Sequence, residues 1–143
     1  MAGLVHSLRF IIASEFGEGR KVQNRILEEV EKHAFGENEV FAIKLALEEA
    51  LINAIKHGNK FDLAKQVRVE ASVTSEEIEI IIEDEGPGFD RSSVPDPTTD
   101  ENVERLHGRG ILLIEAYMSK VEWASGGRRM RMLLRRGHTP HCV

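Results

Sequence analysis

The sequence predicts an α+β fold: a two-layer α/β sandwich whose mostly antiparallel sheet carries helices on one face. Strand-like and helix-like patterns follow one another in the order strand, helix, helix, two strands, helix and two strands. Both pairs of consecutive strands are joined by short turns, which favours antiparallel neighbours. The helical segments carry apolar residues at helical spacing, so each should bury a face.

The N-terminal part of the chain predicts one strand and one helix. Leu8 to Ala13 is a short apolar run, and the Gly17-Glu18-Gly19 sequence after it is a turn signal. From Arg20 to His33, apolar residues recur at helical spacing between charges, and Gly36 then supplies a stop signal. We therefore expect a strand at 8–13 and a helix at 20–33.

The stretch from Phe41 to Asn59 predicts a second helix, which is a core helix and ends near Gly58. Acidic and capping groups at 37–39 precede it. Its apolar residues recur close to the helical period, at Ile43, Leu47, Ala50, Leu51, Ala54 and Ile55. This spacing indicates that the helix buries at least one broad face.

Two polar residues share one stripe of this helix. Glu49 and Asn53 are four residues apart, with the small residues Ala42 and Ala46 below them. A pocket is expected there. The alternative is that the stripe is the solvated face of an amphipathic helix. Phe41 is assigned to the core rather than to a ligand site.

The middle of the chain predicts an antiparallel hairpin. From Gln66 to Val73, apolar and polar residues alternate with the period of two that a half-buried strand requires. Thr74-Ser75-Glu76 forms the turn, and a second strand runs from Ile78 to Glu83.

The last part of the chain predicts a long irregular segment, one helix and two strands. Pro87 to His107 has turn formers but little periodicity, as a lid or a disordered loop has. An apolar helix at Ile111 to Tyr117 follows Gly108-Arg109-Gly110. Lys120 to Ala124 and Arg129 to Leu134 are expected to pair around a glycine turn.

Length and composition indicate one domain that spans residues 1–143. Of these residues 41% are hydrophobic, enough for a core that folds alone. The net charge of -5 disfavours general nucleic-acid binding. Five arginines nevertheless gather near the C-terminus, as a partner surface or as solvated strand edges: Arg128, Arg129, Arg131, Arg135 and Arg136.

No feature of the sequence predicts secretion or a membrane anchor. The N-terminal residues lack the pattern of a signal peptide, and no run approaches about 18 consecutive apolar residues. The single cysteine, Cys142, cannot form an internal disulfide. We expect a cytoplasmic protein without direct contact to membrane or nucleic acid.

Several common catalytic motifs are absent from the sequence. There is no Gly-x4-Gly-Lys-Ser/Thr, and neither Gly17-Glu18-Gly19 nor Gly86-Pro87-Gly88 continues into Gly-x-Gly-x-x-Gly. His-Glu-x-x-His, a cysteine pair and Gly-x-Ser-x-Gly are also missing. P-loop, Rossmann, zinc-protease and serine-hydrolase chemistry therefore have no support.

Three blocks remain, which occur in this order: Glu49-Ala50-Leu51-Ile52-Asn53-Ala54 with His57-Gly58; Asp84-Glu85-Gly86-Pro87-Gly88-Phe89; and Gly108-Arg109-Gly110-Ile111-Leu112-Leu113-Ile114. In this order and spacing they resemble the N, G1 and G2 boxes of the GHKL ATPase superfamily, whose ATP site is the Bergerat fold. The resemblance covers nearly the whole chain. The small size and the Glu-Ala-x-x-Asn-Ala form of the first block look like the bacterial anti-sigma-factor serine-protein kinases.

The resemblance implies an ATP- and Mg²⁺-dependent serine-protein kinase that is also an anti-sigma factor. Such a protein phosphorylates a serine of an anti-anti-sigma (STAS-type) protein and sequesters a sigma factor, and a homodimer is implied as well. One alternative is the ATP-binding domain of a histidine kinase system, which needs an upstream helical domain with a phosphoacceptor histidine. Another is a non-catalytic, nucleotide-dependent partner-binding module, against which the presence of Glu49 argues.

The residue types in the blocks suit this chemistry. An Asn oxygen is a hard, neutral ligand, which makes Asn53 the candidate Mg²⁺ ligand. One turn earlier, Glu49 is the candidate base, the role of the matching Glu in the resembled family. Its neighbour Glu48 points about 100° away and should face solvent or have a structural role. The resemblance assigns Asp84 to the adenine amino group; the alternative is a strand-end turn residue.

Six further residues are candidates for nucleotide binding: Gly86, Gly88, Arg105, Gly108, Arg109 and Gly110. The first two glycines permit close backbone approach. Gly108 and Gly110 stand at a helix start, where backbone N–H groups and the helix dipole favour phosphate. The two arginines add charge toward phosphates or a bound protein, or are solvated loop residues.

The chain departs from the resembled family at one place. Members often have a Gly-Thr pair on the penultimate strand, where the Thr supports adenine binding. Here Gly126-Gly127 leads to Arg128-Arg129. The sequence therefore does not supply that auxiliary contact.

Overall fold

The computed structural model describes residues 6–86 and 106–138. Along these ranges the elements are β1 (His6–Ala13), α1 (Phe16–Lys32), α2 (Glu37–Ile52), a π-helix (Asn53–Gly58), β2 (Gln66–Val73), β3 (Glu77–Glu83), α3 (Leu106–Tyr117), β4 (Lys120–Ala124), a 3₁₀ turn (Ser125–Gly127) and β5 (Arg129–Arg135). The order of strands and helices is the one that the sequence predicts.

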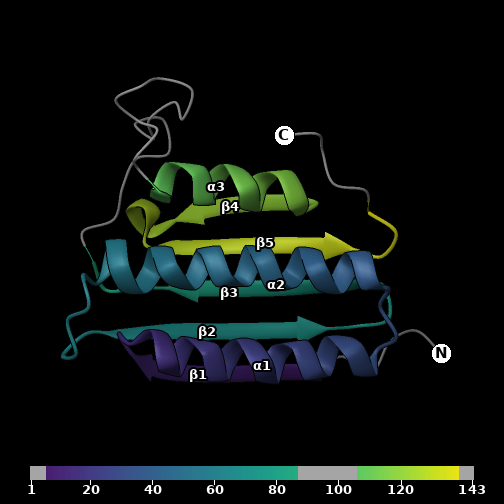
Figure 1. Ribbon diagram of the computed structural model, residues 1–143, viewed down its shortest axis with the longest axis horizontal. Helices are drawn as coiled ribbons and strands as arrows, with labels where there is room; N and C mark the ends of the chain where they lie inside the picture. Colours follow the sequence, from purple (N-terminus) through teal and green to yellow (C-terminus); the bar gives the residue numbers. More distant parts are fainter. Residues whose placement is uncertain (1–5, 87–105, 139–143) are drawn as a thin grey trace.

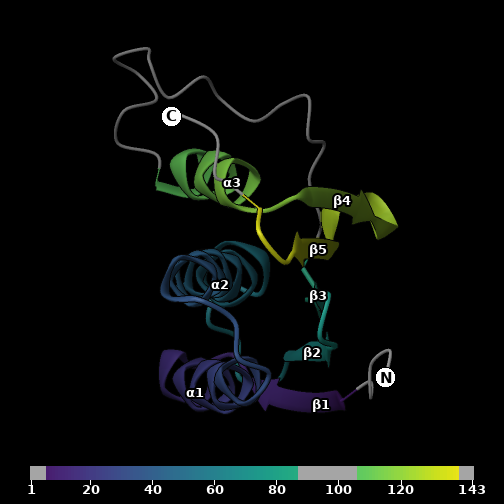
Figure 2. The same ribbon diagram turned by 90° about the vertical axis from the view of Figure 1, so that its right-hand side faces the viewer.

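The strands form one sheet in the order β1-β2-β3-β5-β4, and every neighbouring pair is antiparallel. Figure 2 shows α1, α2 and α3 on one side of this sheet, with α2 between the other two helices. The predicted α+β two-layer sandwich with helices on one face is therefore confirmed.

The alternation of β2 and β3 places their buried side chains on one face of the sheet. Val67, Val69, Ala71 and Val73 of β2 are buried, and so are Ile78, Ile80 and Ile82 of β3. The predicted hairpin turn is also present. The Thr74 hydroxyl oxygen accepts hydrogen bonds from the N–H groups of Glu76 (3.2 Å) and Glu77 (3.0 Å), which closes the turn.

The start of α1 differs from the sequence prediction. The Gly17-Glu18-Gly19 sequence, predicted as a turn, forms the first helical turn after Phe16. Two glycines in three residues favour a turn when only the local sequence is considered. Here Gly19 packs against the core, since a Cβ built on it would lie 3.2 Å from Ile55 Cδ1. Tertiary packing thus overrides the local propensity of the glycines.

The α1–α2 connection also differs from its prediction. Ala34, with φ 57°, takes the left-handed conformation after α1, a position where glycine is usual. Gly36 instead precedes α2, where its N–H donates to Glu39 Oε1 at 2.8 Å. The helix predicted to start at Phe41 therefore starts at Glu37, because Glu39 caps it.

The position of α2 between α1 and α3 accounts for its burial. All six apolar residues of the predicted face are buried, and so are Ala42 and Ala46. The small side chains of these two alanines let neighbouring elements approach closely, and the pocket predicted on the Glu49 and Asn53 stripe stays a prediction. Phe41, expected in the core, is 55% exposed, and its ring packs edge-on against Tyr117 at 6.0 Å.

Two of the C-terminal arginines are engaged within the chain. Arg131 donates to Glu79 at 2.8 Å and to Glu122 at 3.2 Å on neighbouring strands. Arg136 donates to the carbonyl oxygens of His33 (2.8 Å) and Ala34 (3.1 Å) after α1. These two residues therefore join elements of the fold instead of forming an open basic surface.

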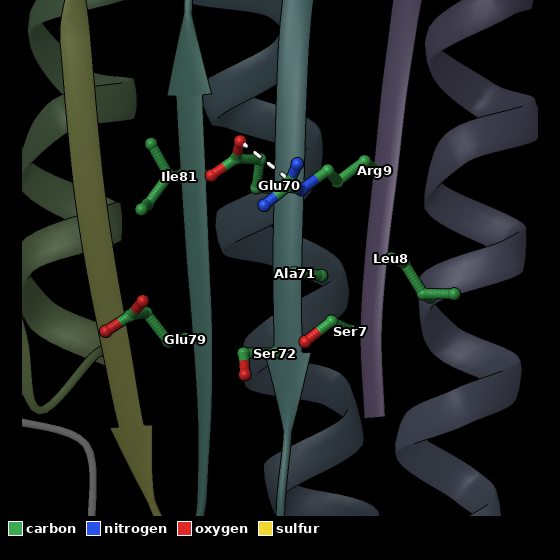
Figure 3. Close-up of a pocket in the computed structure, with 8 residues that line it drawn as sticks. All are labelled: Ser7, Leu8, Arg9, Glu70, Ala71, Ser72, Glu79 and Ile81. Carbon is green, nitrogen blue, oxygen red and sulfur yellow. Dashed lines mark ion pairs between the residues drawn. The ribbon is translucent and has the colours of Figure 1, made fainter. Parts of the chain in front are cut away.

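The sheet face without helices carries a shallow cavity of about 200 Å³. Figure 3 shows its lining on β1, β2 and β3, with Arg9 and Glu70 as an ion pair at 3.8 Å. No residue of the candidate site lines it.

Within the described residues, no helix is both long enough and apolar enough to cross a bilayer.

Candidate nucleotide site

The candidate site residues lie at one end of the sandwich. In Figure 1 the π-helix that follows α2, the end of β3 and the start of α3 all lie at the left-hand end. Contacts confirm part of this convergence, because α3 packs on α2 and also reaches the π-helix. These contacts join the first and third sequence blocks, and the close approach of Gly58 to Asp84 and Gly86 joins the first and second.

Glu49 lies in the last turn of α2 and is half-buried, whereas Glu48 is exposed. This difference is the one predicted from their angular separation along the helix. Burial raises the pKa of the Glu49 carboxyl above its ordinary value, and the nearby charge of Glu48 adds to the rise. A carboxylate with a raised pKa is a stronger proton acceptor, as a general base must be.

Asn53 marks the point where α2 changes to a π-helix. Short π-helical segments inside α-helices occur frequently at functional sites. The Asn53 Nδ2 atom is buried and has no hydrogen-bond partner among the described residues. A buried amide without a partner is costly, so Asn53 is suited to a ligand that is not part of these residues.

Asp84 follows β3 directly and is held on both sides. Its N–H donates to the carbonyl oxygen of Arg128 at 3.0 Å, and its Oδ1 accepts from the N–H of Gly86 at 2.8 Å. Burial raises the pKa of the Asp84 carboxyl, and the charge of Glu83 adds to the rise. The hydrogen bond from Gly86 and the positive charges of Arg128 and Lys65 lower this pKa in part.

Gly58 and Gly86 allow the π-helix and the end of β3 to touch. A Cβ on Gly86 would lie 2.0 Å from the carbonyl oxygen of Gly58, and a Cβ on Gly58 would lie 2.5 Å from the Asp84 carboxylate. The close approach predicted for Gly86 is thus to the protein's own backbone. Gly58, which the sequence indicates only as a helix end, is part of the site's framework.

We expect Gly86→Ala to lower the free energy of unfolding by about 1–3 kcal/mol, because the new Cβ forces two backbone segments apart. Gly17→Ala is the matched control, since a Cβ on Gly17 meets no atom within 4 Å. Urea denaturation of both variants measures the effect. A Gly86→Ala protein as stable as Gly17→Ala would contradict the packing described for Gly58 and Gly86.

The third block begins α3 earlier than predicted. The helix starts at Leu106, so Gly108-Arg109-Gly110 lies inside its first turns and the predicted irregular segment ends before His107. The first four N–H groups of a helix have no intrahelical partner. By position, the N–H of Gly108 belongs to that group, whereas Gly110, the fifth residue, lies beyond it.

Two predicted site residues lie outside the described residues: Gly88 and Arg105. The cysteine at 142 and residues 88–105 of the lid predicted at 88–107 also lie there, whereas residues 106 and 107 belong to α3. Within residues 6–86 and 106–138, no three His, Cys, Asp or Glu side chains gather as a metal-binding group would require. A cation held by one Asn and by phosphate oxygens does not need such a group.

The sequence pattern does not single out Asn59, which the structure places beside Asp84. Asn59 is 1% exposed, and its Oδ1 accepts a hydrogen bond from the N–H of Glu85 at 2.8 Å. A polar residue directly after a helix-ending glycine reads as an ordinary loop residue. Its burial and its hydrogen bond to Glu85, the residue after Asp84, place it beside the candidate site.

The fold and the three blocks define a nucleotide-binding class of protein, and comparison with known families agrees. Residues 16–134 match the family described as histidine kinase-like ATPase domain. The chain belongs to this family, and the resemblance to GHKL ATPases is thereby confirmed.

Individual relatives narrow the similarity further. The chain is 38% identical over 87 residues to an anti-sigma F factor of Clostridium perfringens, a match that covers 59% of this chain and 61% of that protein. It is 33% identical over 86 residues to serine-protein kinase RsbW of Oceanobacillus iheyensis, covering 56% and 54%. For RsbW of Bacillus subtilis the identity is 31% over 90 residues, covering 59% and 56%. The chain thus spans less than two thirds of the length of these relatives.

Proposed function

We propose that this chain is an ATP- and Mg²⁺-dependent serine-protein kinase that acts on an anti-anti-sigma (STAS-type) protein and also sequesters a sigma factor. The names of the relatives support both activities. The observation that carries the proposal is the half-buried carboxylate of Glu49, one turn before Asn53, whose Nδ2 atom has no hydrogen-bond partner among the described residues. The extension of this helix packs against Asp84. A homodimer, a single domain over 1–143 and a cytoplasmic location belong to the same proposal.

The residues of this end fit an adenine nucleotide. The carboxylate oxygen of Asp84 accepts a hydrogen bond from the adenine amino group. Among residues 6–86 and 106–138 the Asn53 Nδ2 atom has no hydrogen-bond partner, and the two ends of the amide exchange by rotation, so its oxygen is available as an Mg²⁺ ligand. Bound Mg²⁺ neutralises charge on the phosphates. Phosphate contacts are proposed for Gly88, Arg105, Gly108 and Arg109. For Gly110, whose N–H lies beyond the helix start, we propose that the missing side chain leaves room for the nucleotide.

Glu49 then performs the proton transfer. Its carboxylate takes the proton from the acceptor serine hydroxyl as the oxygen attacks the γ-phosphorus and the bond to the β-phosphate oxygen breaks. Burial raises its pKa and so increases its affinity for that proton. The rest of the rate enhancement comes from holding the two reactants in line.

The direct test is to incubate the protein with γ-labelled ATP, Mg²⁺ and proteins from the same source, and to locate the label by mass spectrometry. We expect label on a serine of a small regulatory protein and none when EDTA replaces Mg²⁺. Label on a histidine of another chain would favour a histidine kinase system. Tight, nucleotide-dependent partner binding without label would favour the non-catalytic binding module.

Asp84→Asn should weaken ATP binding roughly 10-fold and reduce the preference for ATP over GTP. The amide presents an NH₂ group to the adenine amino group in one of its two orientations, whereas the carboxylate accepts with either oxygen. Calorimetric titration of both proteins with ATP and GTP measures this. Equal affinity of the unmutated protein for the two nucleotides would rule out Asp84 as the adenine contact. Glu83→Gln, one residue earlier, is the control.

A further inference from the structure

Asn59 is one of few polar side chains buried in the described part of the chain, at 1% exposure. Its Nδ2 donates to the Ser14 hydroxyl oxygen and to the Gln66 carbonyl oxygen, both at 3.0 Å. Its Oδ1 accepts from the N–H of Glu85 at 2.8 Å. Both donor hydrogens and the acceptor oxygen of this amide are therefore used within the protein.

The three partners of Asn59 come from three segments. Ser14 follows β1, Gln66 begins β2 and Glu85 follows β3. Two further bonds close the network: the Ser14 hydroxyl donates to the carbonyl oxygen of Lys65 at 2.7 Å, and the Gln66 N–H donates to the Glu85 carboxylate. Because the Asn59 amide at the centre of this network is buried and fully satisfied, it holds its partners in one geometry.

This network sets the position of the segment that carries Asp84. On one side, the N–H of Asp84 is bonded to Arg128; on the other, the N–H of Glu85 is bonded to Asn59. The Asp84 carboxylate is then oriented by Gly86, the next residue along. Without Asn59, the N–H of Glu85 loses the acceptor described for it, the Oδ1 atom that follows the π-helix.

We propose that Asn59 is a positioning residue of the nucleotide site, which fixes the Asp84 carboxylate and thereby sets the preference for adenine over guanine. This inference rests on the proposed function, in which Asp84 contacts the base. Asn59 itself is too deeply buried to touch a nucleotide, so it acts through Glu85 and Asp84.

The test compares Asn59→Ala with Gln23→Ala, a matched loss of a buried amide. Gln23 is 9% exposed and donates to the carbonyl oxygen of Lys44 at 2.9 Å, between α1 and α2 and away from Asp84. Titration with ATP and GTP measures the ATP-to-GTP affinity ratio of each variant. This ratio should drop about 10-fold for Asn59→Ala and less than about twofold for Gln23→Ala. The two differ because displacement of a contact group by about 1 Å is costly only at the nucleotide site. Thermal unfolding of both variants records their losses of stability.

A second measurement needs no variant. In the nucleotide-free protein, the Glu85 amide should exchange its hydrogen as slowly as the ladder amides of β3, because its acceptor is a buried side chain. Fast exchange would overturn the inference. So would an Asn59→Ala protein with the unmutated ATP-to-GTP ratio, and this result would leave the proposed function standing. Failure of the unmutated protein to bind either nucleotide would overturn both.

Discussion

Glu49→Gln is expected to slow phosphoryl transfer about 100-fold or more while changing the affinity for ATP by less than about threefold. The amide keeps the shape of the carboxylate but cannot take up a proton at neutral pH. Single-turnover transfer to the acceptor protein, at saturating ATP and Mg²⁺, measures the chemical step. Full-speed transfer by the variant would remove Glu49 from the role of base.

The control for this variant is Glu48→Gln, which removes the exposed neighbouring carboxylate from the same turn of α2. Transfer by Glu48→Gln should stay within about threefold of the unmutated rate, since this side chain faces solvent. Equal losses in the two variants would mean that charge on this turn of the helix matters in general, and that Glu49 has no specific role.

The stability of Glu49→Gln gives an independent check of the site's electrostatics. The folded protein holds the pKa of Glu49 above its unfolded value, so it favours the uncharged carboxyl. That favourable contribution is complete below the unfolded pKa and is lost as the pH rises through the folded pKa. Glutamine is uncharged throughout, so the variant should be more stable than the unmutated protein at neutral pH and should lose this advantage in acid.

Asn53→Ala is expected to weaken Mg²⁺-dependent ATP binding on the order of 100-fold while the protein remains folded. The side-chain amide has an unpartnered nitrogen among the described residues, so its removal breaks no internal hydrogen bond at that atom. Titration with ATP in Mg²⁺ and in EDTA separates the metal-dependent part. The expected loss is confined to the Mg²⁺ titration.

Asn38→Ala is the control for this variant, because Asn38 is exposed and lies in the first turn of the same helix. It should bind Mg²⁺ and ATP as the unmutated protein does. If Asn53→Ala keeps its full Mg²⁺ dependence, Asn53 is not the metal ligand. If both variants lose binding equally, the loss reflects the helix and not the site.

The strands were predictable because a half-buried strand records its burial as alternation. Residues 67 to 73 and 78 to 82 alternate between buried and partly exposed positions, as their sequence indicates. The helix boundaries were less predictable. Gly17 and Gly19 read as a turn but lie in α1, and Gly36 reads as the end of one helix but occupies the N-cap position of the next. Glycine marks irregular backbone in a sequence, and only packing decides whether a helix begins, continues or ends at that position.

The candidate site was predictable where a block is continuous in sequence and unpredictable where it depends on contacts between blocks. Helical spacing places Glu49 and Asn53 on one stripe of α2, and the roles proposed for them rest on the family resemblance of the block that contains both. The contact between Gly58 and Gly86 joins residues that are far apart in the chain, and the buried amide of Asn59 bonds to three segments at once. The change to a π-helix at Asn53 likewise has no pattern in a single sequence.

The proposal that this end of the sandwich binds an adenine nucleotide is tested most directly by NMR titration of the isotope-labelled protein with ATP and Mg²⁺. The amide signals of Asn53, Asp84 and Gly86 should shift most among the described residues, whereas those of the helix-free sheet face, such as Arg9 and Ser72, should stay in place. Signals that shift mainly on the sheet face, or that do not shift at all, would contradict the assignment of the nucleotide site.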